Sequence, residues 1–158
     1  MVVSMLWHEF IKSITSNDTS WNGYSEWRVI SQDMVNQFAD VTGDYNLLHI
    51  GNNVESLGTF KGGVAHGFLL LSLLSSFGYE VFPAMPENSF SVNYGFDRIR
   101  FMHPVYIGAK IRAYFKLYKY DLRLRDQIFL FFDSKIEIEN SPRLALKTRW
   151  IIAIKKTI

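Results

Sequence analysis

The stretch that decides the fold is AHGFLLLSLLSSF, residues 65–77, which predicts a helix. Leucine and phenylalanine surround almost the whole circumference of this helix, and Gly78 is its predicted stop. A helix that is apolar all round must be buried on nearly every side. The chain has 158 residues, enough for one compact domain. In so small a chain, the simplest way to bury this helix is to wrap a sheet around it.

The second half of the chain alternates between apolar and polar residues, which predicts strands. The predicted strands cover residues 90–101, 110–120, 128–139 and 144–155. Gly95 breaks the first of them. Period-two alternation joined by short turns predicts antiparallel strands with one face in water. The predicted fold class is therefore α+β, an antiparallel sheet wrapped around a long buried central helix.

The start of the chain, residues 1–25, is predicted to be an extension of a main domain that covers residues 26–158. Apolar residues at helical spacing predict a short helix in this extension. They are Trp7, Phe10, Ile11 and Ile14. The polar stretch 16–25 predicts a loop.

A first strand is expected at residues 26–30, followed by a helix that begins after Ser31 and ends at Gly43. Serine is a favoured N-cap, and glycine is common just past a helix C-terminus. The predicted apolar face of this helix consists of Met34, Val35, Phe38, Ala39 and Val41. The Gly-rich stretch 44–63 is expected to be irregular, with one helical turn near residues 54–57.

The composition excludes several classes of function. The net charge is only +2, with 17 basic and 15 acidic side chains and no polybasic run, so nucleic acid is not an expected partner. Because cysteine is absent, disulfides and thiol nucleophiles are excluded. No apolar run is long enough to cross a bilayer, and no signal-peptide pattern is present. A soluble cytoplasmic protein with no membrane association is therefore expected.

Common cofactor and hydrolase motifs are also missing. The sequence has no HExxH and no close cluster of histidines and carboxylates beyond Asp44 with His49. A metal site needs three or four converging ligands, so none is predicted. The sequence has no GxGxxG motif and no P-loop, and no GxSxG elbow marks a serine nucleophile. No cofactor is expected.

The first candidate site is the segment DYNLLH, residues 44–49. A five-residue spacing does not place two side chains on one helix face, so a turn must bring Asp44 and His49 together. A carboxylate and an imidazole that converge can hold a water, and the imidazole can exchange a proton near neutral pH. Taken alone, the spacing favours a structural alternative, in which Asp44 caps a turn and His49 is a half-buried loop side chain.

The second candidate site is GGVAHG, residues 62–67, at the start of the central helix. The first N–H groups of a helix lack intrahelical acceptors, and Gly67 would let a carbonyl oxygen approach one of them as in an oxyanion hole. The alternative is that these glycines only permit a tight turn. Ser72 could reach a bound polar group, although the sequence alone favours a bond back to its own helix. His66 and His103 are interpreted as structural residues.

These segments, in this order, resemble the MaoC-like dehydratase family. The sequence FADVTGDYNLLH (38–49) is similar to the family's D-x-N-P-x-H motif, which follows a helix ending in T-G or S-G. The sequence GVAHGFL (63–69) is similar to its A-H-G-x-L segment. The sequence SVNYGFDRIRF (91–101), followed by Pro104, Val105 and Gly108, resembles the NodN-like branch of this family.

The resemblance covers roughly residues 26–155 and implies a single hotdog domain in a homodimer or larger assembly. It implies a hydratase that adds water to a trans-2-enoyl thioester, of coenzyme A or of an acyl-carrier protein, to give the (R)-3-hydroxyacyl thioester. Leu47 stands where the family usually has proline, and the NodN-like branch also lacks this proline. This departure leaves the acyl substrate less defined than the fold.

The motif match also implies the site residues. Asp44 and His49 take the catalytic acid/base positions, and Gly67 takes the position of the backbone donor to the thioester carbonyl. The implied substrate-binding residues are Gly67, Ser72, Asn46 and His66.

Two rival functions stay open at the level of the sequence. A hotdog thioesterase also uses a water and a polarised thioester carbonyl, and analysis of the products separates it from a hydratase. A non-catalytic acyl-thioester-binding protein would keep the fold and bind without turnover.

Overall fold

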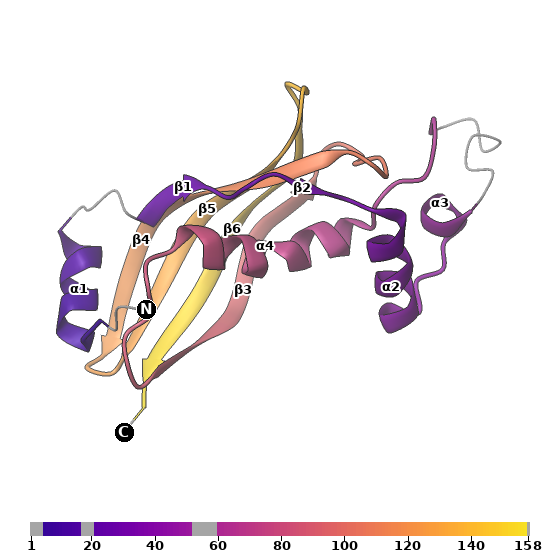
Figure 1. Ribbon diagram of the computed structural model, residues 1–158. Helices are drawn as coiled ribbons and strands as arrows, with labels where there is room; N and C mark the ends of the chain where they lie inside the picture. The colour runs from indigo at the N-terminus through magenta and orange to yellow at the C-terminus, as the bar shows by residue number, and fades with distance from the viewer. Residues whose placement is uncertain (1–4, 17–20, 52–59, 158) are drawn as a thin grey trace.

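The computed structural model describes residues 5–16, 21–51 and 60–157, and it places helix α4 (Gly67–Val81) along one face of an antiparallel sheet (Figure 1). The sheet has the order β1-β4-β5-β6-β3, with β2 also paired to β4. The bounds are β1 Asn22–Tyr24, β2 Arg28–Val29, β3 Ser89–Phe101, β4 Lys110–Leu124, β5 Gln127–Ile138 and β6 Leu144–Lys156. The predicted α+β class is confirmed.

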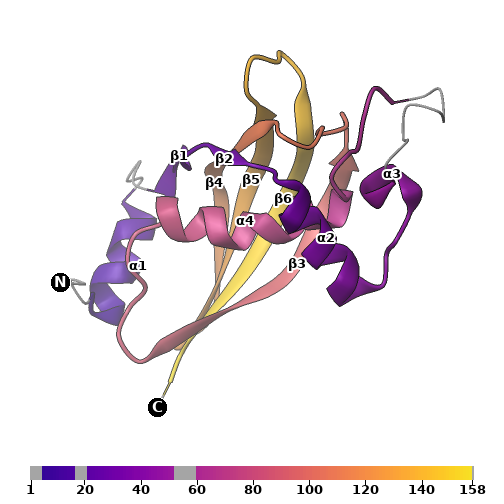
Figure 2. The same cartoon turned by 45° about the vertical axis from the view of Figure 1, so that its right-hand side comes forward.

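Three shorter helices lie at the two ends of α4 (Figures 1 and 2). Helix α1 (Trp7–Thr15), the short helix predicted for the N-terminal segment, lies toward the C-terminal end of α4. Helices α2 (Gln32–Thr42) and α3 (Leu47–Ile50) lie beside its N-terminal end. Both segments singled out from the sequence for their chemistry are therefore at one end of the molecule.

The inner face of the sheet carries the alternation that the sequence predicts. On β4, Ile111, Ala113 and Phe115 have no exposed surface, while the two residues between them are partly exposed. Phe82, just after α4, packs at ring-centroid distances of 4.4 Å from Phe132 and 5.0 Å from Phe115. Aromatic side chains thus form the centre of the core under the end of α4.

Burial of α4 is one-sided, which corrects the expectation of burial all round. Leu69, Leu74 and Phe77 are buried against the sheet, whereas Phe68 is 65% exposed and Tyr79 is 80% exposed. The sheet of a single chain curves around only one side of the helix, so the other side has nothing to pack against. Among the described residues, no helix combines the length and apolar character needed to span a membrane.

Gly78 lies inside α4 rather than at its end, so the predicted stop was wrong. The helix continues to Val81, and the N–H of Phe82 donates to the carbonyl of Gly78. A Cβ on Gly78 would lie 2.9 Å from the Phe82 ring and 3.2 Å from the Trp150 ring. Glycine is required here by the close approach of these rings and not by a turn.

Helix α2 begins and ends as predicted. The hydroxyl of Ser31 accepts a hydrogen bond from the N–H of Met34, and Gly43 follows the helix with φ 74°, in the left-handed region. The apolar face was wrong at one position, since Val41 is 87% exposed whereas Ala39 is buried. Residues two apart point to opposite sides of a helix.

The stretch predicted as a loop, residues 16–25, contains a strand of the main sheet. Asn22–Tyr24 forms β1 and pairs with Lys116–Tyr114 of β4. Trp21, just before it, is fully buried, and its indole N–H donates to the Ser13 hydroxyl at 3.3 Å. A single short strand of three residues has too little alternation to be predicted from sequence. The helical turn expected near residues 54–57 lies outside the described residues.

The outer face of the sheet is not uniformly polar, contrary to the prediction of one wet face. Phe129, Ile151 and Ala153 form a small buried cluster there. The guanidinium of Arg123 lies 4.6 Å from the centre of the Phe129 ring, and the Tyr94 ring meets Phe129 edge-on at 4.8 Å. Long polar side chains therefore cover apolar ones while keeping their heads in water.

Gly78→Ala is expected to lower the free energy of unfolding by about 1 kcal/mol. Overpacking typically costs about 1–3 kcal/mol, and the better helix propensity of alanine returns about 1 kcal/mol. Urea unfolding would measure the difference. The matched control is Gly95→Ala, where an added Cβ meets nothing within 4 Å. Equal stability of the two variants would contradict the packing role of Gly78.

Candidate active site

The two segments singled out from the sequence meet at the N-terminal end of α4 (Figure 2). The N–H of Val64 donates to the carbonyl of Leu48 at 3.0 Å, which ties the second segment to α3. The N–H of Ala65 donates to the carbonyl of Val105 at 2.8 Å, which anchors the same segment to the chain after β3. The scaffold thus fixes both segments through their backbones.

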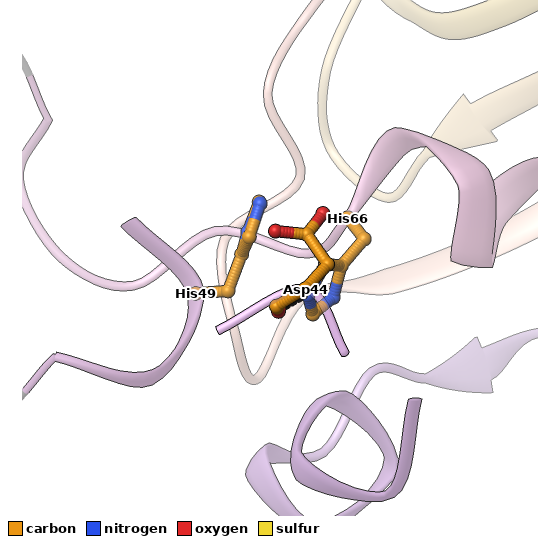
Figure 3. Close-up of side chains that lie close together, drawn as sticks. All are labelled: Asp44, His49 and His66. Atoms are coloured by element: carbon orange, nitrogen blue, oxygen red, sulfur yellow. Dashed lines mark hydrogen bonds between the residues drawn. The ribbon is translucent and has the colours of Figure 1, made fainter. Parts of the chain in front are cut away.

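Asp44, His49 and His66 come together at this junction (Figure 3). A carboxylate oxygen of Asp44 and one ring nitrogen from each histidine all lie within 4.8 Å of one another. The side chain of Asp44 is exposed, that of His49 is half-buried and that of His66 is only 1% exposed. The structure therefore brings together the predicted acid–histidine pair and adds a second histidine to it.

The ring of His49 is held in one orientation. Its Nδ1 lies 2.7 Å from the carbonyl oxygen of Val64. Because a carbonyl can only accept, Nδ1 must carry the proton, and Nε2 of a neutral ring is then left with a lone pair. His49 can therefore act as a base through Nε2.

Asn46 shapes the turn between Asp44 and His49. Its side-chain oxygen accepts a hydrogen bond from the N–H of Leu48 at 3.1 Å and caps α3. Its own N–H donates to the Asp44 carboxylate at 3.4 Å. The contacts of Asn46 seen here are those of a cap, and its predicted role in substrate binding stays a prediction. The one-turn helix α3 was missed because it is too short for periodicity to reveal.

His66 supports both members of the pair. Its Nε2–H donates to the backbone carbonyl of Asp44 at 3.0 Å. Its ring stacks on that of His49, with centroids 3.8 Å apart and planes inclined by 29°, and the Phe38 ring lies 5.0 Å away on α2. Its buried Nδ1 has no hydrogen-bond partner among the described residues. Sequence reasoning assigned His66 a structural or substrate-binding role and had no signal for this stacking.

The stacked histidines are poorly arranged to share a metal ion. The lone pair of an imidazole nitrogen lies in the plane of its ring, so two nearly parallel rings direct their lone pairs side by side. A metal ion needs lone pairs that converge at about 2.0–2.1 Å. The geometry favours proton transfer and water binding over shared coordination by His49 and His66.

Gly67 is the first residue of α4, so its N–H has no acceptor within the helix. A Cβ at this position would lie 3.0–3.1 Å from three atoms of the Phe101 ring. A side chain at this position would crowd the ring, and the N–H of Gly67 lies at the positive end of the helix dipole. These features match an oxyanion donor.

Ser72, unlike Gly67, has a side chain that forms a hydrogen bond within its own helix. The hydroxyl of Ser72 donates to the carbonyl of Phe68 at 2.8 Å, which is the local helix bond that the sequence favoured. Its side chain lies on the exposed side of α4. A role of Ser72 in substrate binding stays a prediction.

One residue of the motif has a perturbed ionisation. The hydroxyl of Tyr45 donates to the Asp40 carboxylate at 3.1 Å. This hydrogen bond and the negative charge of Asp40 raise the pKa of the Tyr45 phenol above its usual value. Tyr45 thus stays neutral and does not contribute a base to the site at physiological pH.

Similarity to known proteins identifies the family of this chain. Residues 21–129 match the family described as MaoC like domain. Nodulation protein N of Rhizobium meliloti (strain 1021) is 38% identical over 130 residues, which cover 82% of this chain and 81% of that protein. The 3-hydroxyacyl-thioester dehydratase Z of Mycobacterium tuberculosis (strain ATCC 25618 / H37Rv) is 30% identical, covering 82% of this chain and 85% of that protein.

Solved structures share the fold. The R-hydratase PhaJ1 from Pseudomonas aeruginosa in the unliganded form superposes with a TM-score of 0.66 at 19% identity, covering 87% of this chain and 81% of that one. The hotdog fold implied by the sequence resemblance is confirmed. The match to the family over residues 21–129, together with relatives at 30–38% identity across most of their length, shows that the chain belongs to the MaoC-like domain family.

Proposed function

We propose that this protein interconverts a trans-2-enoyl thioester and water with the (R)-3-hydroxyacyl thioester. The observation that carries the proposal is the hydrogen bond from His49 Nδ1 to the carbonyl of Val64. It leaves a lone pair on Nε2, and a ring nitrogen of His49 lies within 4.8 Å of the Asp44 carboxylate, so that the two side chains can hold and activate one water. The names of the dehydratase and hydratase relatives agree with this chemistry.

The reaction needs four events at the site. The water oxygen bonds to the β-carbon, and the electron pair of the carbon–carbon double bond moves toward the thioester oxygen. The N–H of Gly67 and the end of α4 stabilise the negative charge on that oxygen. A proton of the water passes to Asp44 or His49. A proton from the same pair then reaches the α-carbon, so no other reactant is consumed and no cofactor is required.

The substrate would be a thioester of coenzyme A or of an acyl-carrier protein. A thioesterase would use the same water and the same oxyanion donor, so the site geometry is common to both reactions. The difference lies in the bond that breaks. Hydration removes the conjugated double bond and keeps the thioester, whereas hydrolysis releases a free thiol.

We also propose that the protein is a homodimer in which strand β3 pairs with its symmetry mate. In the described chain β3 is an edge of the sheet and is paired only with β6. Its outward residues Phe90, Val92 and Tyr94 are 47–59% exposed. A long edge strand with exposed apolar residues is prone to pair with another strand. The uncovered side of α4 lies next to this edge, since Asn93 donates to the Ser75 hydroxyl.

The imidazoles of His49 and His66 are expected to be opposite tautomers. Val64 requires the proton on Nδ1 of His49, and the carbonyl of Asp44 requires it on Nε2 of His66. Two-bond nitrogen–proton correlations in ¹⁵N-labelled protein above pH 7.5 would assign each tautomer. The exposed His8 provides a reference ring. An Nε2–H tautomer at His49 would contradict the proposed base.

Asp44→Asn and His49→Ala are each expected to lower kcat for hydration by about 10²- to 10⁴-fold, since positioned acid–base groups contribute that much. Loss of enoyl-thioester absorbance would be followed with crotonyl-CoA and with a medium-chain trans-2-enoyl-CoA, beside a free-thiol assay. The controls are Asp33→Asn, an exposed carboxylate on α2, and His8→Ala.

Each outcome of this assay decides between functions. Absorbance loss without thiol, abolished in both site variants and kept in both controls, supports the hydratase. Thiol release would make the protein a thioesterase. Binding of both thioesters without any turnover would support a non-catalytic binding protein.

Val92→Lys is expected to convert the dimer to a monomer, because it places a charge on the edge next to the same charge of the partner copy. Light scattering coupled to size-exclusion chromatography would give the mass. Leu122→Lys is the matched control, since Leu122 on β4 and Val92 are each 47% exposed. A wild-type monomer, or equal effects of both substitutions, would refute pairing through β3.

A further inference from the structure

Three cations lie in one row across the outer face of the sheet. Lys147 on β6 is directly opposite Lys135 on β5 and directly opposite Arg100 on β3. Like charges directly opposite each other on neighbouring strands are destabilising. A row of this kind therefore indicates a constraint other than stability of the sheet.

Among the described residues, only one of the three cations is neutralised by a carboxylate. Lys135 Nζ lies 2.7 Å from a carboxylate oxygen of Glu137, and this hydrogen bond raises the pKa of Lys135. In the part of the chain that the structure describes, Arg100 and Lys147 form no ion pair. The contact of Arg100 is with a backbone oxygen, the carbonyl of Ile99, at 2.8 Å.

The adjacent row shows how the same sheet arranges charges that are compensated. Arg149 on β6 is opposite Asp133 on β5 and Asp97 on β3. Its guanidinium lies 2.9 Å from the Asp133 carboxylate and stacks 3.6 Å from the centre of the Tyr118 ring. The alternation of acid, base and acid in this row contrasts with three bases in the row beside it.

Arg100 and Lys147 of the first row and all three residues of the second row line an open cleft of about 1340 Å³ along the edge strand β3, whose walls also include Arg98. Its charged side chains are four cations and two carboxylates, which are Arg98, Arg100, Lys147, Arg149, Asp97 and Asp133. The cleft is therefore positive by two charges. The strand pairing of β3 shifts between Asp97 and Arg100, and Arg98 has φ 58°, so an irregularity of β3 brings an additional arginine to the cleft.

One wall of the cleft leads to the candidate active site. Phe101 lines the cleft, and its ring lies against Gly67, the proposed donor to the thioester oxygen. A thioester held at Gly67 could thus extend its carrier part toward Arg100 and Lys147.

We infer that Arg98, Arg100 and Lys147 bind a phosphate group of the thioester carrier, an inference that rests on the proposed function. The shared chemistry is a phosphate attached to a pantetheine arm, which occurs in coenzyme A and on acyl-carrier proteins. Arginine and lysine are the side chains that bind phosphate most strongly. A bound phosphate would also relieve the repulsion between Arg100 and Lys147.

The test compares two substrates that carry the same acyl group. Crotonyl-CoA has the phosphates, and the crotonyl thioester of N-acetylcysteamine has the end of the arm without them. Arg100→Gln and Lys147→Gln are each expected to raise KM for crotonyl-CoA about tenfold, as loss of a charge-assisted hydrogen bond does, and to leave kcat unchanged. Neither should change KM for the N-acetylcysteamine thioester.

The matched control is Lys155→Gln, a lysine exposed on the same strand but paired opposite Phe90 and Gln127. It should change neither KM. Since Lys147 faces two cations, Lys147→Gln should be at least as stable to urea as the wild type, so misfolding does not obscure the result. Equal changes of KM for both substrates, or no change for crotonyl-CoA, would overturn the phosphate site.

Binding measured without turnover separates this inference from the proposed reaction. Calorimetric titration of coenzyme A should show about tenfold weaker binding to Lys147→Gln than to the wild type, even if no enoyl thioester is hydrated. Failure of hydration with this loss of binding would refute the hydratase and keep the phosphate site. Competition by 4′-phosphopantetheine or by adenosine 3′,5′-bisphosphate identifies which phosphate is held. If Lys147→Gln binds both compounds as tightly as the wild type does, the phosphate site is overturned.

Discussion

The contact between one side of α4 and the inner face of the sheet is the constraint on which the other features depend. Leu69, Leu74 and Phe77 bury this side, and Gly78 lets the Phe82 and Trp150 rings close under it. The position of α4 along the sheet sets where its N-terminus lies. That N-terminus supplies the free N–H groups, and α2 and α3 assemble next to it.

The candidate site is an arrangement of backbone carbonyls as much as of side chains. The carbonyl of Val64 fixes the tautomer of His49, and the carbonyl of Asp44 fixes that of His66. Each contact joins the 44–49 segment to the residues leading into α4. Because the histidine rings also stack, a change in either segment would be transmitted to the other. Acid–base catalysis needs side chains that are held in place in this way.

The outer face of the sheet is built differently from the inner face. Its apolar cluster is covered by long cations and by Tyr94, while the row formed by Lys135, Lys147 and Arg100 concentrates positive charge near the edge strand. The same edge strand contributes Phe101 beside Gly67. Strand β3 thus links the proposed dimer edge, the charged cleft and the end of α4 in one element.

The sequence by itself determined the α+β class, the strands and the two segments that carry chemistry. Alternation and helical spacing report local burial, and Ser31 and Gly43 report the ends of α2 through short-range contacts. The motifs then indicated Asp44 and His49, which do lie together.

Only the tertiary structure decided which side of α4 is covered, why Gly78 is a glycine and how His66 joins the site. It also showed the cations that face one another across strands. Each of these depends on residues far apart in the chain, such as Lys147 with Arg100. Strand pairing and helix packing set these contacts. They join side chains that are distant along the chain, and the local spacing of residues reports which face of an element is buried but not which side chain of another element it meets.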